Sequence, residues 1–441
     1  MNRKVLYWSI TAALAGFLFG FDTVVISGAE QKIQLLWNLS AGLHGVAIAS
    51  ALYGTVLGAL AGGWSTDRFG RRITLLLIGL LYLAGALWSA LAANVEGFIA
   101  ARILGGIGIG ISTIAAPLYI SEISPPRHRG LLAGMFQFNI VFGILVAYLS
   151  NALLSGAGVN AWRWMLGVAA VPSLIYTLCC LTLPESPRWL ISRRDDLPDG
   201  LRVLRLIRPE AADAAIQAEA DAIRAAGVEP GTAGRFWSWR LRLPIALAFL
   251  IALFNQMSGI NAILYFAPRI FEMTGLGAQA ALLQSVGIGI TNLVCTFIGL
   301  WLIDRLGRRT LLYIGSCGYI LSLSLVSWAF LTQHYRIVPA CIFAFIGAHA
   351  VGQGAVIWVY VAEIFPNRHR AEGQALGSFT HWTFAALLTS FFPKLVAAFP
   401  PGEVFAFFAG MMMLQLLWVK TMVIETRGVS LEMIQERLRL A

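Results

Sequence analysis

The chain has 441 residues; 58% of them are hydrophobic and only 12% are charged, against roughly 25% charged residues in a soluble domain. Long stretches lack any Asp, Glu, Lys or Arg, among them 33–66, 130–162 and 273–303. A helix that crosses the hydrocarbon core of a bilayer needs about 20 apolar residues, whereas membrane β-strands alternate over about 10. The composition therefore excludes a soluble fold and a membrane β-barrel, and it predicts an all-α membrane protein.

We expect twelve membrane-spanning helices, and an even number places both termini on the same side of the membrane. Most of the 32 Lys and Arg residues fall on that side, so the positive-inside rule makes it the cytoplasm. The net charge of +10 then reflects topology and not a nucleic-acid partner. The expected spans are 5–29, 43–66, 73–93, 98–120, 130–152, 164–183, 244–268, 280–303, 310–331, 337–361, 373–396 and 403–424. The Lys and Arg residues expected on the opposite side are Lys32, Arg163, Arg269, Arg336 and Lys394, while Arg102 falls within a span.

One long polar segment separates the spans into two groups of six. The predicted parts are an N-terminal six-helix half (1–183), a cytoplasmic linker (184–243), a C-terminal six-helix half (244–424) and a cytoplasmic tail (425–441). Within the linker, the Ala-rich stretch 209–226 predicts short amphipathic helices, and Glu229-Pro230-Gly231 is expected to end them. The five cysteines fall in predicted spans without metal-ligand spacing, so we expect small buried residues and no metal site.

The two halves repeat each other in sequence. Asp-Arg-Phe-Gly-Arg-Arg at 67–72 recurs as Asp-Arg-Leu-Gly-Arg-Arg at 304–309. The stretch 119–129 recurs at 360–370 with seven of eleven positions identical. Parallel six-helix repeats with a binding site between them near the middle of the membrane are typical of alternating-access transporters.

Two further motifs accompany these loops: Pro-Glu-Ser-Pro-Arg-Trp-Leu at 184–190, and 256–266, which begins Gln-Met-Ser-Gly-Ile-Asn and ends Tyr-Phe. In this order the motifs resemble the sugar porter family of the major facilitator superfamily, which includes bacterial xylose and glucose proton symporters and animal glucose facilitators. The resemblance covers essentially the whole chain and implies the major facilitator fold. It departs at 424–428, where Ile-Glu-Thr-Arg-Gly stands in place of the usual Pro-Glu-Thr-Lys-Gly.

Acidic and arginine side chains recur at the cytoplasmic ends of the predicted helices. The planar guanidinium group of Arg binds carboxylates with two hydrogen bonds, and in the resembled family these motifs are taken to latch the cytoplasmic side shut. The alternative is that Arg only fixes the topology. For Arg71, Arg72, Arg308 and Arg309 we give the latch and the topology signal equal weight, whereas for Glu122 and Glu363 we favour the latch. The candidate latch residues are Asp67, Arg71, Arg72, Glu122, Arg129, Glu185, Arg188, Asp304, Arg308, Arg309, Glu363, Arg370 and Glu425.

Asp22 and Arg102 are charged residues inside predicted spans, where an unpaired charge is costly and is usually functional. Pairing them would remove both costs, and a modest movement of Arg102 would then decide whether Asp22 holds a proton. The resemblance implies that Asp22 matches the carboxylate of proton-coupled sugar porters, where animal facilitators carry a neutral residue. The alternative is a static structural ion pair.

A monosaccharide presents hydroxyl groups that both donate and accept hydrogen bonds, so its site needs amides and aromatic faces. A single amide in a span can instead join two helices, at a gain of about 1 kcal/mol. Asn255 and His381 depart from the xylose symporters, in which a glutamine and an amide are usual. His349 and His381 are potential proton carriers, although we favour packing or sugar contact. The candidate sugar-binding residues are Phe19, Gln137, Asn255, Gln256, Asn261, Tyr265, Asn292, Gly354, Trp358, His381 and Trp382.

These features together predict an inner-membrane importer of a monosaccharide, a hexose or a pentose, that works by proton symport as two halves rock. We expect it to function as a monomer, with both termini cytoplasmic and with no cofactor besides the coupling proton. The alternatives are a proton-independent sugar uniporter, a drug exporter of the same superfamily, or a sugar sensor, which would be expected to carry a longer cytoplasmic tail. An enzyme is not expected, because no nucleophile–base set is apparent.

Overall fold

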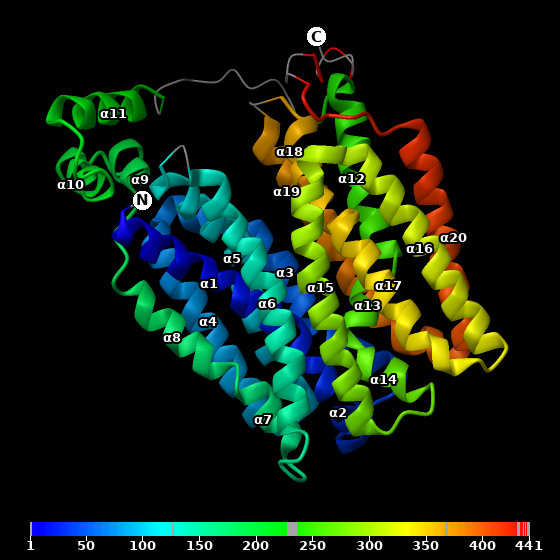
Figure 1. Ribbon diagram of the computed structural model, residues 1–441. Helices are drawn as coiled ribbons and strands as arrows, with labels where there is room; N and C mark the ends of the chain where they lie inside the picture. Colours follow the sequence, from blue (N-terminus) through cyan, green and yellow to red (C-terminus); the bar gives the residue numbers. More distant parts are fainter. Residues whose placement is uncertain are drawn as a thin grey trace. The chain divides into compact units, whose positions relative to one another are not determined.

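The computed structural model describes residues 2–125, 128–226, 236–366, 369–429, 433, 434, 436 and 438, without the side chains of 129–131 and 133. In this part of the chain the regular structure consists of α-helices and short 3-10 helices, with no strand (Figure 1). The all-α expectation is therefore confirmed.

The helices of the first predicted half are α1 Arg3–Val25, η1 Ile26–Gly28, α2 Glu30–Leu36, α3 Ala41–Phe69, α4 Arg71–Leu91, α5 Val95–Ile123, α6 Arg129–Leu154, α7 Ala161–Gly167 and α8 Ala170–Cys180. The predicted linker contains α9 Pro187–Ser192, α10 Leu197–Ile207, α11 Asp213–Ala226 and η3 Trp239–Leu241. The second half contains α12 Arg242–Met257, α13 Ile260–Tyr265, α14 Ala267–Glu272, α15 Ala278–Leu306, α16 Arg308–Leu331, η4 Tyr335–Ile337, α17 Val338–Val351, α18 Gln353–Ile364, α19 Arg370–Ala398 and α20 Pro401–Thr421.

Eleven helical stretches in the described residues are long and apolar enough to cross a membrane. Each of them overlaps one of the twelve predicted spans. The remaining predicted span, 373–396, lies in α19, which has 29 residues but carries Thr380, His381 and Lys394 along its length. These polar side chains lower its hydropathy, although the helix is as long as α3, α5 and α15.

Four of the predicted spans are broken, so the expectation of a continuous helix is wrong for them. Span 244–268 consists of α12, α13 and α14, and the first break is at Gly259, whose φ of 84° is in the left-handed region. Span 337–361 breaks at Gly352, where a Cβ atom would lie 2.8 Å from the Cα of Gly315. Span 5–29 ends in η1 before α2, and span 164–183 consists of α7 and α8. Hydrophobic runs set span lengths but carry little information about such backbone breaks.

The chain separates into two compact units. The first contains Met1–Thr23, Tyr53–Ile144 and Leu166–Thr232, and the second contains Val24–Leu52, Leu145–Met165 and Ala233–Ala441. Two segments of the predicted first half thus belong to the second unit. The predicted boundaries at 183/184 and 243/244 follow the sequence repeat and remain a prediction.

Contacts inside the second unit explain this grouping. The hydroxyl of Tyr148 donates a hydrogen bond to the carbonyl of Leu264 at 2.7 Å. The side chain of Asn151 donates to the carbonyl of Val25 at 3.0 Å. At Gly45, a Cβ atom would lie 1.9 Å from the carbonyl oxygen of Ser390, so α3 and α19 approach as closely as only glycine permits.

Three short linker helices, α9, α10 and α11, lie beside the start of α1 in the first unit (Figure 1). They share a small apolar core of Ile191, Leu204, Ile216 and Ala220, and the side chain of Asn2 donates to the carbonyl of Leu206 at 2.7 Å. The helix predicted within 209–226 is present as α11. The expected break at 229–231 and most of the predicted tail lie outside the described residues.

All five cysteines are free thiols. Cys180 and Cys341 are buried as expected, and Cys179 and Cys295 are half-buried. Cys317 is exposed on α16, so the expectation of burial is wrong there. In a membrane-spanning helix the exposed face contacts lipid, and a thiol is apolar enough to lie against it.

Gly259 provides a test of the break between α12 and α13. Gly259→Ala places a side chain where φ is positive, at a cost of about 1–2 kcal/mol, and its Cβ would meet the ring of Phe408 at 2.9 Å. We expect a lower Tm in detergent, measured by tryptophan fluorescence. Gly410→Ala in α20 is the control, because nothing lies within 4 Å of its added Cβ. Equal Tm values for the two variants would contradict a strained requirement at Gly259.

Candidate functional site

The predicted pairing of Asp22 with Arg102 is confirmed within the first unit. Nη1 of Arg102 lies 2.6 Å from Oδ1 of Asp22, and Nη2 donates to the backbone carbonyl of Asp22 at 3.1 Å. The two side chains are only 3% and 9% exposed for Arg102 and Asp22. Oδ2 of Asp22 has no hydrogen-bond partner among the described residues. One oxygen of the carboxylate is therefore left outside the ion pair.

Close backbone packing fixes the position of Asp22. Glycines in α1 and α6 allow these two helices to touch: a Cβ atom on Gly20 would lie 1.9 Å from the carbonyl oxygen of Ile140, and one on Gly143 would lie 2.2 Å from that of Phe17. Small residues at such crossings are the usual way in which membrane helices pack closely. With α1 held in this way, the pair depends mainly on the position of α5, which carries Arg102.

Four of the predicted sugar-binding residues form a connected polar group in the second unit. The side-chain nitrogen of Gln256 donates to Oδ1 of Asn255 at 2.9 Å, and the Gln256 side-chain oxygen accepts from Asn261 at 2.7 Å. The imidazole of His381 lies 3.2 Å from the same Gln256 nitrogen. The helix break at Gly259 lies between Gln256 and Asn261 and lets their side chains meet across it. The structure thus brings together amides from α12 and α13 with a histidine from α19.

Aromatic rings surround the histidine of this group. The His381 ring centroid is 5.2 Å from that of Trp358 and 4.7 Å from that of Trp382. Trp358 and His381 are half-buried, and Trp382 is buried. Amides that donate and accept beside aromatic faces are the combination that a sugar ring requires.

The remaining candidate residues are less closely tied to this group. Asn292 is buried on α15 and makes no side-chain hydrogen bond with the described residues, and Tyr265 is buried at the end of α13. Gly354 lies against the His349 ring, which is itself hydrogen-bonded to the Tyr319 hydroxyl at 2.6 Å. The two candidates of the first unit are Phe19, buried on α1, and Gln137, half-buried on α6.

Gln353 is a candidate that the sequence reasoning missed. It is the first residue of α18, is 0% exposed, and receives only a long hydrogen bond of 3.5 Å from Asn255. Its Nε2 has no partner among the described residues, and an unsatisfied buried amide costs about 1–3 kcal/mol. A ligand hydroxyl would remove that cost. The available signal was an amide inside a predicted span, directly before Gly354.

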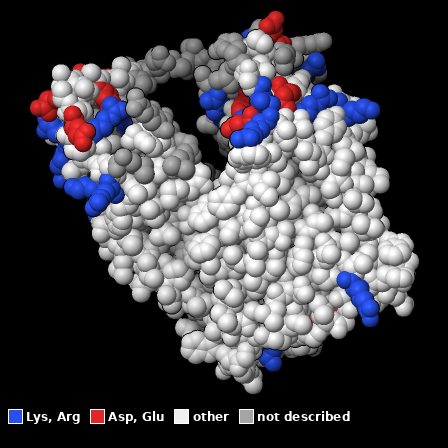
Figure 2. Space-filling model, viewed as in Figure 1, with Lys and Arg blue, Asp and Glu red and all other residues white. Residues whose placement is uncertain are grey.

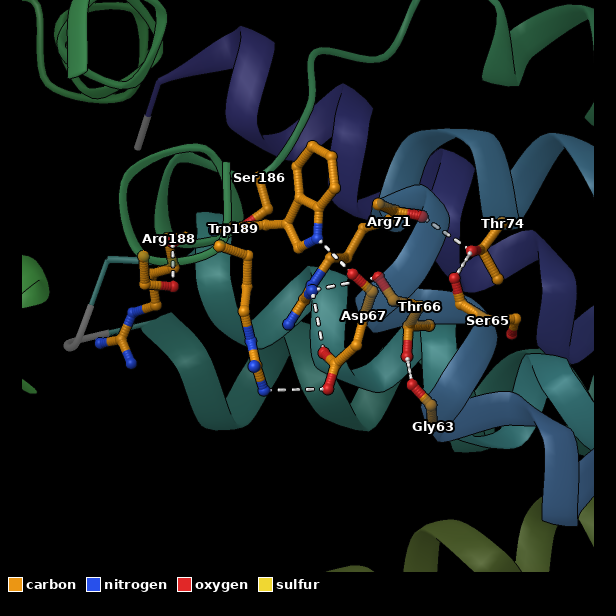
Figure 3. A network of polar contacts seen from close by, with 12 residues as sticks. Gly63, Ser65, Thr66, Asp67, Arg71, Thr74, Ser186, Arg188 and Trp189 are labelled. Carbon is orange, nitrogen blue, oxygen red and sulfur yellow. Dashed lines mark hydrogen bonds and ion pairs between the residues drawn. The ribbon is translucent and has the colours of Figure 1, made fainter. Parts of the chain in front are cut away.

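A buried ion-pair cluster lies at one end of the first unit. Arg71 binds Glu122 with two hydrogen bonds, of 2.9 and 3.0 Å, and also contacts Asp67 at 3.4 Å. The backbone N–H groups of Arg71 and Arg72 donate to the Glu185 carboxylate at 2.8 and 3.2 Å. Figure 3 shows Trp189 pointing at the same loop, where its indole N–H donates to the Asp67 carbonyl at 2.9 Å. Burial raises the pKa of Glu185, while the backbone N–H groups oppose that rise.

The second unit repeats this cluster almost atom for atom. Arg308 binds Glu363 with hydrogen bonds of 2.8 and 3.1 Å and contacts Asp304 at 3.1 Å. The backbone N–H groups of Arg308 and Arg309 donate to Glu425 at 2.9 and 3.0 Å. Each of the two carboxylates thus lies at the N-terminus of a helix, Glu185 at α4 and Glu425 at α16. There its negative charge also interacts favourably with the helix dipole.

A glycine with positive φ precedes each of these helices. Gly70 has a φ of 87° and Gly307 has a φ of 89°. A Cβ atom at Gly70 would lie 2.4 Å from Glu185 Oε2, and one at Gly307 would lie 2.5 Å from Glu425 Oε2. The repeated Gly of the two loops is therefore required both by backbone conformation and by the approach of the carboxylate.

The ion pairs recorded among the predicted latch residues join helices of the same unit. They connect α4 with α3 and α5 in the first unit, and α16 with α15 and α18 in the second. Arg188 and Arg370 make no ion pair with a described residue, and the side chain of Arg129 lies outside the described residues. A latch that separates as the halves rock remains a prediction. In Figure 2 the charged side chains gather at the end of each unit that carries these clusters, next to a broad uncharged surface.

Apolar spanning helices with buried ion pairs and a duplicated loop cluster define a multi-pass membrane protein of the transporter class. Residues 8–438 match the family model described as sugar (and other) transporter, and the chain belongs to this family. It is 34% identical to the arabinose-proton symporter of Bacillus subtilis, over 98% of this chain and 94% of that protein. It is 32% identical to the D-xylose-proton symporter of Escherichia coli, over 96% of this chain and 94% of that protein.

The solved structures agree with the family. The inward open xylose transporter XylE from E. coli matches with a TM-score of 0.87 and 29% identity, over 98% of this chain and 99% of that chain. The structure of XylE, a proton:xylose symporter of the major facilitator superfamily, bound to 6-bromo-6-deoxy-D-glucose matches with a TM-score of 0.80 and 30% identity, over 99% of both chains. The expected fold and family are confirmed, and the family is one of transporters and not of enzymes.

The two clusters predict a graded response to the loss of their arginines. Arg71→Gln leaves Glu122, which is 7% exposed, without its partner, whereas Arg308→Gln leaves Glu363, which is 26% exposed. Removing one partner of a buried ion pair costs about 3–5 kcal/mol, and solvent reduces this cost for a more exposed group. We expect both variants to lower Tm, Arg71→Gln more than Arg308→Gln. The double variant Arg71→Gln/Glu122→Gln should recover part of the loss, and an equal loss in the single and double variants would contradict the pairing.

Proposed function

We propose that this protein imports a monosaccharide together with a proton, and that Asp22 is the group that carries the proton. The observation that carries this proposal is the buried Asp22–Arg102 pair, at 2.6 Å, in which one carboxylate oxygen has no partner among the described residues. The protein works as a monomer, binds no cofactor other than the coupling proton, and is located in the inner membrane.

The ion pair supplies the coupling element. While Arg102 is in contact, Asp22 is held as a carboxylate, because the two charges offset each other's burial. When a helix movement withdraws Arg102, a lone buried carboxylate is costly and takes up a proton. Because α5 carries Arg102 and α1 carries Asp22, a small displacement of one helix against the other is enough to switch between these states.

The amide and aromatic group supports a sugar as the substrate. Gln256, Asn261 and Gln353 present both donors and acceptors, and the Trp358 ring is partly accessible beside His381. Similar proteins also support this substrate class, because they include an arabinose-proton symporter, a D-xylose transporter and a galactose-proton symporter.

The direction of insertion follows from the distribution of positive charge. We assign the cytoplasm to the side of the predicted linker and of both termini, because most of the Lys and Arg residues fall in the segments expected on that side. The latch residues then lie on the cytoplasmic side of each half.

A proton-independent sugar uniporter is the second candidate. The two hydrogen bonds from Arg102 to Asp22 favour it, since they are also what a static structural pair would make. In that case the carboxylate would stay ionised throughout transport, and sugar would only equilibrate across the membrane.

Asp22→Asn separates these two functions. In proteoliposomes with an imposed inward proton gradient, the wild type should accumulate labelled monosaccharide, and the variant should lose this accumulation, because an amide cannot take up the proton. Counterflow of sugar without a gradient should survive in the variant. Equal, gradient-independent equilibration in both proteins would instead identify a uniporter.

Gln256→Ala tests the sugar site. We expect the variant to lose binding of every monosaccharide in a thermal-shift panel of hexoses and pentoses, because Gln256 connects three other polar side chains. Gln415→Ala is the matched control: it also removes a fully buried amide in the second unit, one that donates to Ser316 in α16. Intact binding in Gln256→Ala, or equal loss in both variants, would contradict the proposed site.

A further inference from the structure

A fully buried carboxylate lies outside the sites described above. Glu30, at the start of α2, is 0% exposed. Nε and Nη2 of Arg269, on α14, donate to its two oxygens at 2.9 and 2.8 Å. The Nε2 atom of His44, on α3, lies 2.7 Å from Oε2 of Glu30, and His44 is also 0% exposed. Both oxygens of the carboxylate are therefore engaged by residues from two other helices of the second unit.

Further contacts extend this group between α2 and α14. Nη2 of Arg269 also donates to the side chain of Gln34 at 2.6 Å. The side chain of Gln31 donates to Glu272 at 3.0 Å. Helix α14, which follows the break at Phe266, is thus joined to α2 at several points.

The charged and titratable groups around Glu30 come from four helices. They are His44 on α3, Arg269 and Glu272 on α14, Lys394 on α19, which lies against Gly42, and the exposed Lys32 on α2 itself. Nδ1 of His44 has no hydrogen-bond partner among the described residues, and the ring lies edge-on to Phe266 with centroids 6.1 Å apart.

This group lies at the end of the second unit opposite the Arg308 cluster. Arg269 precedes α15 and Asp304 is in the last turn of that helix, whose 29 residues span roughly 40 Å at 1.5 Å each. In an alternating-access cycle, the contacts that close one end of the protein must break when that end opens. The contacts of Arg269 with α2 are contacts of this kind, because they join segments of the two sequence halves.

Charge balance links these contacts to protons. The charges of an ionised Glu30 and Arg269 cancel, and a neutral His44 can donate a hydrogen bond from Nε2 to the carboxylate. Glu30 and His44 are fully buried, so one additional proton on either of them would leave a net positive charge in the buried group, which is costly. The added proton is tolerated once α14 has moved away and water enters. Proton uptake and closure of this end therefore oppose each other, as linked equilibria require.

We propose that Glu30 and His44 form a second proton-binding site. Without the added proton, Glu30 binds Arg269 and holds α14 in place, so that the outer end of the protein is closed; when a proton binds, α14 is released. The direction rests on the proposed function and its membrane orientation, which place this end outside the cell. Acid outside then favours the conformation that is open to the outside, in which sugar and the coupling proton are loaded.

Hydrogen–deuterium exchange of the α14 backbone tests this proposal in the full-length protein in lipid nanodiscs, at several pH values and with correction for the intrinsic exchange rate. In the wild type, exchange of α14 should become faster as the pH falls from 8 to 5. Glu30→Gln, which mimics the protonated carboxyl, should exchange about tenfold faster at pH 8 and lose most of the pH response. His44→Gln should weaken the response.

Matched variants separate the latch from a loss of folding. Arg269→Lys keeps the positive charge but cannot make the two paired hydrogen bonds. Its α14 should therefore exchange at a rate between those of the wild type and Arg269→Gln. Arg336→Gln, at an exposed arginine in the same unit, should behave like the wild type. Each variant is first shown to be monodisperse and folded. A wild-type response that does not depend on pH, or Glu30→Gln exchanging like the wild type, would overturn the proposal.

Asp22→Asn distinguishes this proposal from the proposed function. Because Asp22 belongs to the first unit, the variant should retain the pH response of α14 while it loses proton-driven sugar accumulation. If no sugar moves in any transport assay but the exchange of α14 still responds to pH and to Glu30→Gln, the proposed function fails and the second proton site remains.

Discussion

The cost of an unpaired charge inside a membrane is the constraint on which this structure depends. Carboxylate–arginine pairs satisfy it at places where different helices meet. Asp22 with Arg102 joins α1 to α5, Glu30 with Arg269 joins α2 to α14, and Glu122 with Arg71 joins α5 to α4. Apolar packing alone would allow these helices to slide or rotate. The pairs select one register, and breaking a pair requires that water or a proton take the partner's place.

The sequence predicts the helices well because hydrophobic length is a strong signal, and it predicts the Asp22–Arg102 pair because two isolated charges in spans need each other. It does not predict the breaks at Gly259 and Gly352, since a glycine in an apolar run is as compatible with close packing as with a kink. It also misses Glu30, which the hydropathy pattern assigns to a loop outside the first span, although α2 buries it completely.

The candidate sugar site likewise contains residues that the sequence predicts and one that it does not. Gln256, Asn261 and His381 were selected by residue type and by family resemblance, and the structure places them in contact. The sequence does not single out Gln353, because a lone amide beside Gly354 is equally compatible with helix packing; its burial and its unsatisfied nitrogen are visible only in the structure.

The paired loop clusters also bear on how the chain is assembled. In each half, the carboxylate that completes the cluster, Glu185 or Glu425, comes after the last helix of that half and binds the N–H groups at the start of a much earlier helix. During synthesis, the first cluster can close as soon as Glu185 has left the ribosome, before any helix of the second half exists. The duplicated motif thus lets each predicted half complete its own carboxylate contacts independently of the other.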